Sequence, residues 1–228
     1  PKRIRCEDRP SEEEVRIHNL THLPYRSCCP HCVRGKAGRR NHRRKMRRLR
    51  SKVLVISLDY MWKKGSKEDK TEEPKGNPIL VMHCRDTKIT WSRVVLRKGV
   101  DPCSVNVLSD MVMFTGHKRV ILKSDGESAI KALKDAVKGS LDFNLGVEVS
   151  PVGDSKANGE IERAVKTVQG QVRTLKSALD EHYKTTFNED HVLLPWLIAY
   201  AASLISKFTI GEDVKQLTNG LVVGSSIS

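Results

Sequence analysis

The sequence predicts an α/β fold, a sheet flanked by helices, preceded by a small module rich in His and Cys. Two observations predict the sheet and its helices: short β-branched and aliphatic runs begin after Lys52, and amphipathic helical segments alternate with them. Such alternation is typical of a sheet with helices packed on it. A third observation predicts the module, because three cysteines crowd into residues 28–32 next to histidines.

The strands are expected where apolar, β-branched residues run between turn signals. Residues 53–58 are of the buried-strand type, and this strand ends at Asp59. Further strands are expected at 79–84, 90–96, 120–122 and 147–149. The fourth of the five strands leads to Asp125. The segment 63–77 is charged and contains Gly and Pro, so it is expected to be a loop.

Helices are expected at residues 103–115 and 127–137 and, after a loop, from about Asn158. Six apolar residues of this third helix recur at intervals of three and four, which predicts a buried stripe of five turns. They are Ile161, Val165, Val168, Val172, Leu175 and Leu179. A last helical stretch is expected from Asn188 through Ile205, kinked by Pro195.

The net charge of +14 is concentrated at one end of the chain. Residues 1–52 hold 17 basic and 5 acidic side chains, and residues 34–52 hold 11 basic and no acidic ones. This favours a polyanionic partner, since each neutralised phosphate releases counterions. Residues 34–52 are interpreted as a basic linker, extended or loosely helical.

No stretch approaches the 18 apolar residues of a transmembrane helix, so no membrane partner is expected. The chain begins with Pro1 and shows no secretory segment, which indicates a piece of a longer polypeptide. The crowded cysteines suit a metal site in a reducing compartment better than a disulfide framework.

Three acidic residues stand where their side chains can converge. Asp59 and Asp125 close two strands, and Glu162 lies in the first turns of the long helix, away from its apolar stripe. Taken alone, each aspartate is more often a turn former or a helix cap. Together, three carboxylates can hold two Mg²⁺ or Mn²⁺ ions, the arrangement that phosphoryl transfer uses.

The motifs around these acids resemble a known family. Ser124-Asp125-Gly126 follows a strand, and Asn158-Gly159-Glu160-Ile161-Glu162-Arg163 opens a helix, as in the Asp-Asp-Glu signature of retroviral and copia-like integrases. The resemblance selects Glu162 over Glu160, matches Asp59 to the first acid, and covers residues 18–210. It implies an RNase H-like catalytic core, action on DNA ends, a homo-oligomer, and a nuclear location (or a cytoplasmic one before import).

Residues that would bind DNA are expected in two places. On the long helix, Lys166 and Arg173 follow Glu162 along a solvent-facing ridge, although ordinary helix-supporting ion pairs would give the same pattern. In the linker, the candidates are Arg39, Arg40, Arg43, Arg44, Lys45, Arg47 and Arg48.

The amino-terminal module is expected to bind zinc. His18, His22, Cys29 and Cys32 offer two nitrogens and two thiolates, a normal tetrahedral set. Cys28 or His31 could replace one of these ligands. The integrase family carries a similar His-His-Cys-Cys module, from which this sequence departs by its short spacer between His22 and Cys29.

The expected organisation is a zinc module at 1–33, the linker at 34–52, an RNase H-like core at 53–210 and a divergent tail at 211–228. The predicted function is DNA integration by metal-dependent 3′ processing and strand transfer. A decayed copy that only binds nucleic acid is the first alternative, because the tail departs from the Gly-Lys-Thr-Ala-Tyr-Glu run of related elements. An RNase H-type nuclease, which shares the fold, is the second.

Overall fold

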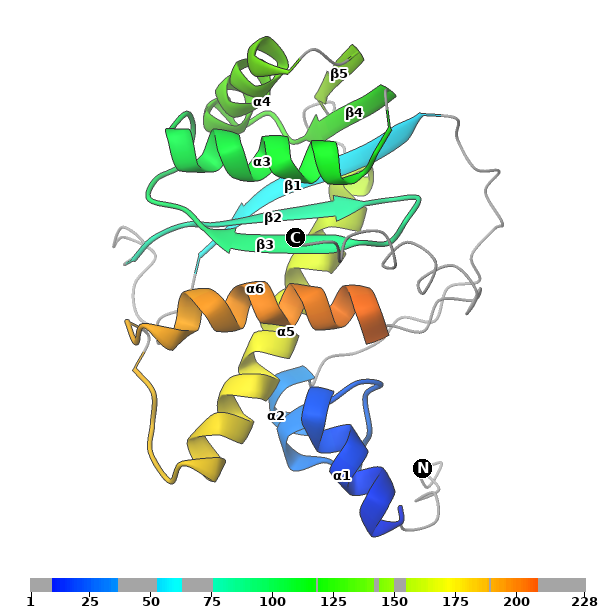
Figure 1. The fold of residues 1–228 in the computed structure, drawn as a ribbon, viewed down its shortest axis with the longest axis vertical. Coiled ribbons are helices and arrows are strands. Elements are labelled where there is room, and N and C mark those ends of the chain that lie inside the picture. The colour runs from blue at the N-terminus through cyan, green and yellow to red at the C-terminus, as the bar shows by residue number, and fades with distance from the viewer. Residues whose placement is uncertain are drawn as a thin grey trace, which may run out of the picture.

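A computed structural model describes residues 10–36, 53–62, 76–117, 119–141, 144–149, 155–188 and 190–208 (Figure 1). Its strands are β1 (Leu54–Met61), β2 (Ile79–Cys84), β3 (Thr90–Val94), β4 (Arg119–Ser124) and β5 (Asn144–Val149). Its helices are α1 (Glu12–Thr21), α2 (Pro30–Lys36), α3 (Pro102–Phe114), α4 (Ser128–Ser140), α5 (Ser155–His182) and α6 (Leu193–Phe208). From β1 onward, their order is the order predicted from the sequence.

The five strands form one mixed sheet in the order β3-β2-β1-β4-β5. β2 pairs antiparallel with both β1 and β3, and a short turn connects β2 to β3. β4 and β5 pair parallel, beside β1, because helices lie between them in the chain. The predicted fold class, an RNase H-like mixed sheet flanked by helices, is confirmed by this architecture.

Helices cover both faces of the sheet. On one face, Ile56, Leu58 and Leu122 pack with residues of α3 and α4 in a fully buried core. On the other, Val81 packs with Val168 of α5 and with residues of α6. Because side chains alternate between the faces of a strand, the odd-numbered residues of β1, including Asp59, lie on the face that α5 covers.

Local signals set several helix ends. Ser11 caps α1, with its hydroxyl accepting from the backbone N–H of Glu14 while the Glu14 carboxylate accepts from that of Ser11. The Asp101 carboxylate caps α3 by accepting from the backbone N–H groups of Cys103 and Ser104, ahead of Pro102 at the first helical position. The described helices include none long and apolar enough to cross a bilayer.

Some predicted bounds were wrong. β1 does not end at Asp59 but continues to Met61, because Asp59 still pairs with Val81 of β2. α6 begins at Leu193 rather than Asn188, so Pro195 falls in its first turn, where a missing N–H breaks no helical hydrogen bond. α2 continues to Lys36, three residues into the predicted linker.

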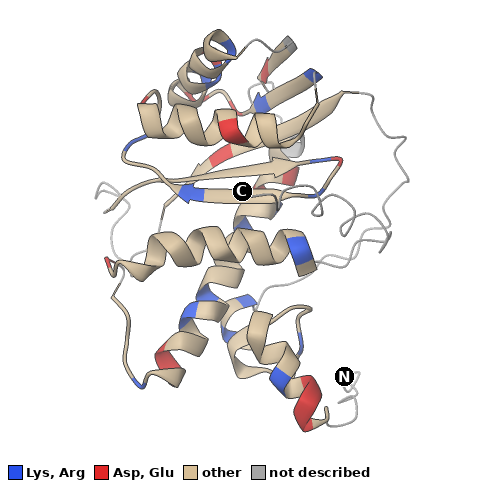
Figure 2. Cartoon of the chain, viewed as in Figure 1, with Lys and Arg blue, Asp and Glu red and all other residues tan. Residues whose placement is uncertain are grey.

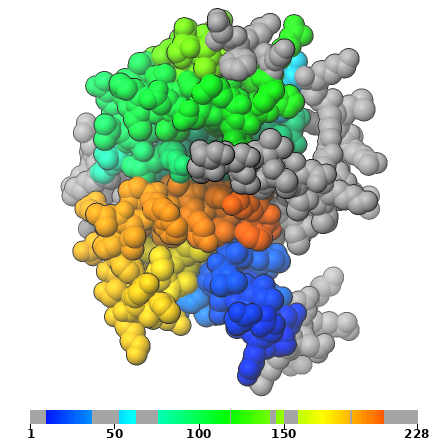
Figure 3. Space-filling view, viewed as in Figure 1, coloured from blue at the N-terminus to red at the C-terminus, as the bar shows by residue number. Residues whose placement is uncertain are grey.

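α5 joins the two parts of the molecule. Its first half packs on the sheet, and its second half runs on beside α1 and α2 (Figure 1). The predicted apolar stripe is buried or half-buried along its length, against the sheet at Ile161 and Val168 and against α6 at Leu175. Figure 3 shows α1 and α2 as a separate lobe that touches α5.

Candidate metal centres

The first candidate site lies where β1 and β4 run side by side. Ser57 of β1 pairs with Lys123 of β4, and two residues further along each chain come Asp59 and Asp125. The parallel register therefore carries the two aspartates to neighbouring positions at the carboxyl end of β4. The pairing of β1 with β4 and its register thus bring these two predicted acids close together.

The surroundings of Asp59 disfavour its charged form. The pKa of Asp59 is raised to about 6, first by burial and then by the charge of Asp125. Glu127 raises it further, while the backbone N–H of Tyr60 and the ammonium of Lys98 oppose the rise. A carboxyl pKa raised by burial and a neighbouring charge is typical of functional sites, although structural networks of charges produce the same shift.

Two residues at this edge were missed by the sequence analysis. Lys98 bonds to Glu127 at 2.7 Å, and its ammonium lies 5.4 Å from the ring centre of Tyr60. The backbone N–H of Glu127 donates to Asp125 Oδ1 at 3.2 Å, which holds that carboxyl at the end of β4. Glu127 follows Asp125 by two residues, so the Asp-Gly-Glu sequence was a signal for it.

The two glutamates at the start of α5 have different surroundings. Glu160 bonds to Arg85 at 2.6 Å and lies 3.5 Å from Lys88, both near the turn between β2 and β3. Burial opposes the charge of Glu160, but these cations hold its pKa below the ordinary value. Glu162 follows by two residues, about 200° around the helix, on the opposite flank. Its side chain is exposed.

The structure does not gather the three predicted acids into one metal-ligand group. Among the described residues, a group of three or more His, Cys, Asp or Glu side chains placed to share an ion is found only in α1, α2 and the turn between them. Asp59 and Asp125 are brought together, whereas Glu162 lies on the exposed flank of α5.

Of the predicted DNA-binding residues, Lys166 is exposed on α5. Arg173 is also exposed, but its Nε donates to the carbonyl of Gly35 at 3.1 Å, so it contributes to packing between helices. Figure 2 shows basic residues on α5 and α2 where these helices lie side by side. The seven linker residues predicted to bind DNA, between Arg39 and Arg48, lie outside the described residues.

The second candidate site is a compact group of two imidazoles and two thiols. The ligand atoms of His18, His22, Cys29 and Cys32 all lie within 4.8 Å of one another, and all four residues are buried. Cys29 Sγ lies 3.4 Å from His22 Nδ1, and Cys32 Sγ lies 3.4 Å from His18 Nε2. Ligands around tetrahedral zinc are separated by roughly 3.5 Å, given bonds of about 2.0–2.3 Å. These residues fit zinc.

Burial keeps this group in its neutral forms. Burial is the largest cause that lowers the pKa of His22 to about 4, and the nearby His18, His31 and Lys36 add to the shift. Burial, followed by the charges of Arg26 and Lys36, also lowers the pKa of His18. Both imidazoles are therefore neutral at pH 7, as ligation requires. Burial raises the pKa of the Cys32 thiol, so that an ion would have to displace its proton.

The alternative ligands are not part of the group. Cys28 is exposed. The Nδ1 atom of His31 bonds to the hydroxyl of Ser177 on α5 at 3.0 Å, and its Nε2 lies 3.7 Å from Glu181. His31 thus connects the module to α5 rather than completing the four-ligand group.

The chain is similar in fold to a solved integrase domain. The catalytic core domain of BIV integrase matches 70% of this chain and 86% of its own, with 13% sequence identity and a TM-score of 0.41. No protein-family model matches the sequence, and no curated protein matches it.

Proposed function

We propose that this chain is a polynucleotidyl transferase that integrates retroelement DNA by metal-dependent 3′ processing and strand transfer. The observation that carries the proposal is the pair of neighbouring aspartates, Asp59 on the face of β1 that α5 covers and Asp125 directly after β4. α5 also carries Glu162, on the flank opposite the cation-bound Glu160.

Asp59, Asp125 and Glu162 are the residues that would hold Mg²⁺ or Mn²⁺, because carboxylate oxygens are the donors these ions prefer. Ions bound there would stabilise the attacking and leaving oxygens of an in-line displacement at phosphorus. The chain's own contribution is positioning: the strand register sets Asp59 beside Asp125, and the Glu127 amide orients the Asp125 carboxyl.

The amino-terminal module would hold zinc through His18, His22, Cys29 and Cys32, whose geometry supports this ligand set. The division into zinc module, basic linker and catalytic core stays a prediction, as do the homo-oligomer and the nuclear location. DNA would be held by Lys166 and by the arginines of the linker, which contact phosphates rather than base edges.

The test of the catalytic proposal compares two neighbouring glutamates. Purified protein is incubated with duplex DNA bearing the element's ends and Mg²⁺ or Mn²⁺, and nicked and joined strands are resolved on denaturing gels. Glu162→Gln should reduce both products by orders of magnitude, since it removes a charged metal ligand. Glu160→Gln is the matched control, since its carboxylate is bound by Arg85.

Two outcomes would overturn the proposal. Loss of activity in Glu160→Gln but not in Glu162→Gln would show that the wrong glutamate was assigned. A parent protein that binds DNA with a steep salt dependence but never cleaves it would instead be a nucleic-acid-binding remnant. Neutralising linker arginines should then weaken binding to all sequences and reduce the salt slope.

A further inference from the structure

Two buried polar atoms of the described residues have no hydrogen-bond partner: Nδ1 of His18 and Oε1 of Gln171. Both side chains are well buried, with 5% of His18 and 0% of Gln171 exposed. A buried polar atom without a partner costs about 1–3 kcal/mol, so each calls for an explanation.

The two side chains come from different parts of the chain, but His18 belongs to α1 and Gln171 bonds to the last residue of α1. Gln171 belongs to α5, and its Nε2 donates to the carbonyl of Thr21 at 2.7 Å. Thr21 follows His18 by three residues in α1, which is close to one helical turn. The unpartnered amide oxygen of Gln171 is thus held beside the helix that presents His18.

The chemistry of the two atoms is complementary. His18 Nε2 faces Cys32 Sγ in the ligand group, so zinc bound at Nε2 leaves Nδ1 as the protonated nitrogen, a donor. The carbonyl of Thr21 accepts from the Gln171 amide nitrogen, which leaves Oε1 as an acceptor. The Nδ1 donor of His18 and the Oε1 acceptor of Gln171 therefore remain buried without partners.

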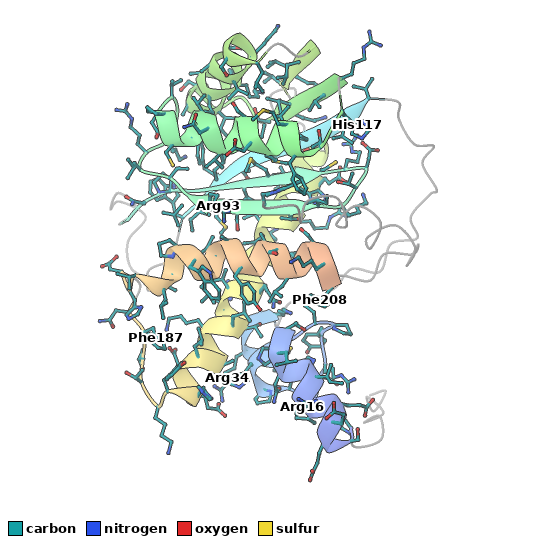
Figure 4. The ribbon with its side chains drawn as sticks, in the orientation of Figure 1. Arg16, Arg34, Arg93, His117, Phe187 and Phe208 are labelled. Carbon is teal, nitrogen blue, oxygen red and sulfur yellow. The ribbon has the colours of Figure 1, made fainter. Side chains whose placement is uncertain are left out.

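Close packing holds Gln171 in this position. Gly35 at the end of α2 lies directly on α5, where an added Cβ would come within 2.9 Å of the Gly170 carbonyl and 2.7 Å of the Thr174 amide. Arg34 of α2, labelled in Figure 4, donates from Nη1 to the Ser177 hydroxyl of α5 at 3.3 Å. The module cannot move along α5 without breaking these contacts.

We propose that Gln171 is a positioning residue of the zinc site: in the zinc-loaded protein the two buried side chains shift so that the Gln171 amide oxygen accepts the Nδ1 proton of His18. Zinc-ligating histidines usually donate their second N–H to an oxygen, which fixes the tautomer and the ring orientation. This inference rests on the zinc binding proposed above. It makes α5, the helix that carries Glu162, part of the amino-terminal metal site.

The experiment measures zinc affinity by competition with a chromophoric chelator, using the full chain. Gln171→Leu removes the acceptor and should weaken zinc binding about 10–100-fold. Gln171→Glu keeps an acceptor oxygen while losing the donor to Thr21, and should remain within a few-fold of the parent. Gln169→Leu, on the half-exposed side of α5, is the matched control and should bind zinc like the parent.

A second readout is the exchange of the His18 Nδ1 proton in the zinc-loaded protein, followed by NMR. It should be slow in the parent and in Gln171→Glu and fast in Gln171→Leu. Equal zinc affinity in parent and Gln171→Leu would overturn the positioning role, and so would equal losses in Gln171→Leu and Gln171→Glu. A parent that binds no zinc would refute the zinc site itself.

Discussion

The two ends of α5 border two candidate metal sites that differ in how completely they are assembled. Beside the second half of the helix, the ligand atoms of four buried residues lie within 4.8 Å of one another. Beside the first half, Asp59 and Asp125 are neighbours, while Glu162 lies on an exposed flank.

The charge of the ligands accounts for this difference. Burial lowers the pKa of His22 to about 4 and raises that of Cys32, so the imidazoles and the thiol approach one another as neutral groups. Carboxylates repel one another, and burial together with Asp125 raises the pKa of Asp59 to about 6. Neutral ligands can be assembled before an ion binds, whereas gathered carboxylates need the charge of their cations.

The largest expected effect is that of removing zinc. Binding to such sites contributes an apparent folding free energy on the order of 10 kcal/mol. Chelation should therefore unfold α1 and α2 while the sheet stays folded. Hydrogen exchange of residues 12–36, compared with that of β1 and β4, measures the effect. Cys32→Ser should reproduce it without chelator, and Cys28→Ser, at the exposed cysteine, should not.

The same measurement can contradict the proposed dependence of α1 and α2 on zinc. If chelation leaves exchange in α1 and α2 unchanged, the neutral ligand group is stable without an ion. The module would then be held by its packing on α5 alone.

The second prediction concerns that packing. Gly35→Ala places a Cβ against the backbone of Gly170 and Thr174, which side-chain rotation cannot relieve. The free energy of unfolding should fall by about 1–3 kcal/mol. Gly139→Ala in α4, whose added Cβ meets open space, is the matched control and should gain up to about 1 kcal/mol. Urea unfolding followed by circular dichroism measures both, and equal effects would refute the close contact.

The order of elements was predictable because it depends on local periodicity. The five strands and the long helix follow from apolar spacing, and the group of His18, His22, Cys29 and Cys32 follows from short-range His and Cys spacing. The end of β1 was not predictable in this way. Whether a strand continues through a polar residue such as Asp59 depends on its pairing with Val81, in another strand.

The packing of α1 and α2 on α5 could not be predicted from the sequence either. Gly35 and Arg173 are bonded across 138 positions of the chain, and nothing local to either residue specifies the other. Arg173 was accordingly predicted to bind DNA from its place on a polar ridge. By contrast, the burial of Lys134 could have been predicted. This lysine lies on the same face of α4 as the apolar residues Ile130 and Val137.

The third prediction tests the support beneath the aspartates. Lys134 is fully buried, and its ammonium donates to the Ser124 hydroxyl at 2.7 Å and to the Glu148 carbonyl at 2.9 Å. It thereby ties the ends of β4 and β5 together next to Asp125. Lys134→Met keeps the volume but leaves both acceptors unpaired, and should cost about 1–2 kcal/mol in urea unfolding.

The exposed Lys138 on the same helix provides the control, since Lys138→Met should change stability by less than about 0.5 kcal/mol. If Lys134→Met is as stable as the parent, the end of β4 does not depend on this buried charge. The positions of Asp59 and Asp125 would then be less fixed by the fold than the comparison with the His and Cys group assumes.

The smallest expected effect concerns the sheet face under α5, where burial should disfavour any charge. His83 of β2 lies on this face, with Nδ1 2.9 Å from the Thr90 hydroxyl. Burial lowers its pKa to about 4; Glu160 opposes the shift, and Lys88, Arg163 and Arg85 add to it. An unfolded histidine has a pKa of about 6.5. The neutral His83 therefore stabilises the fold above pH 6.5, and this contribution is lost as the pH falls towards 4.

Asp59 acts in the opposite sense, because its pKa is raised to about 6 and its protonation at lower pH relieves a buried charge. The parent alone cannot separate the two, so His83→Asn, which keeps a polar partner for Thr90, is compared with it at pH 7 and pH 5. The parent should lose about 1 kcal/mol more than the variant over this range. His117→Asn, at an exposed histidine, should follow the parent. If stability changes equally with pH in the parent and in His83→Asn, this face of the sheet tolerates charge. Repulsion between buried charges would then no longer explain why Glu162 stays apart from Asp59 and Asp125.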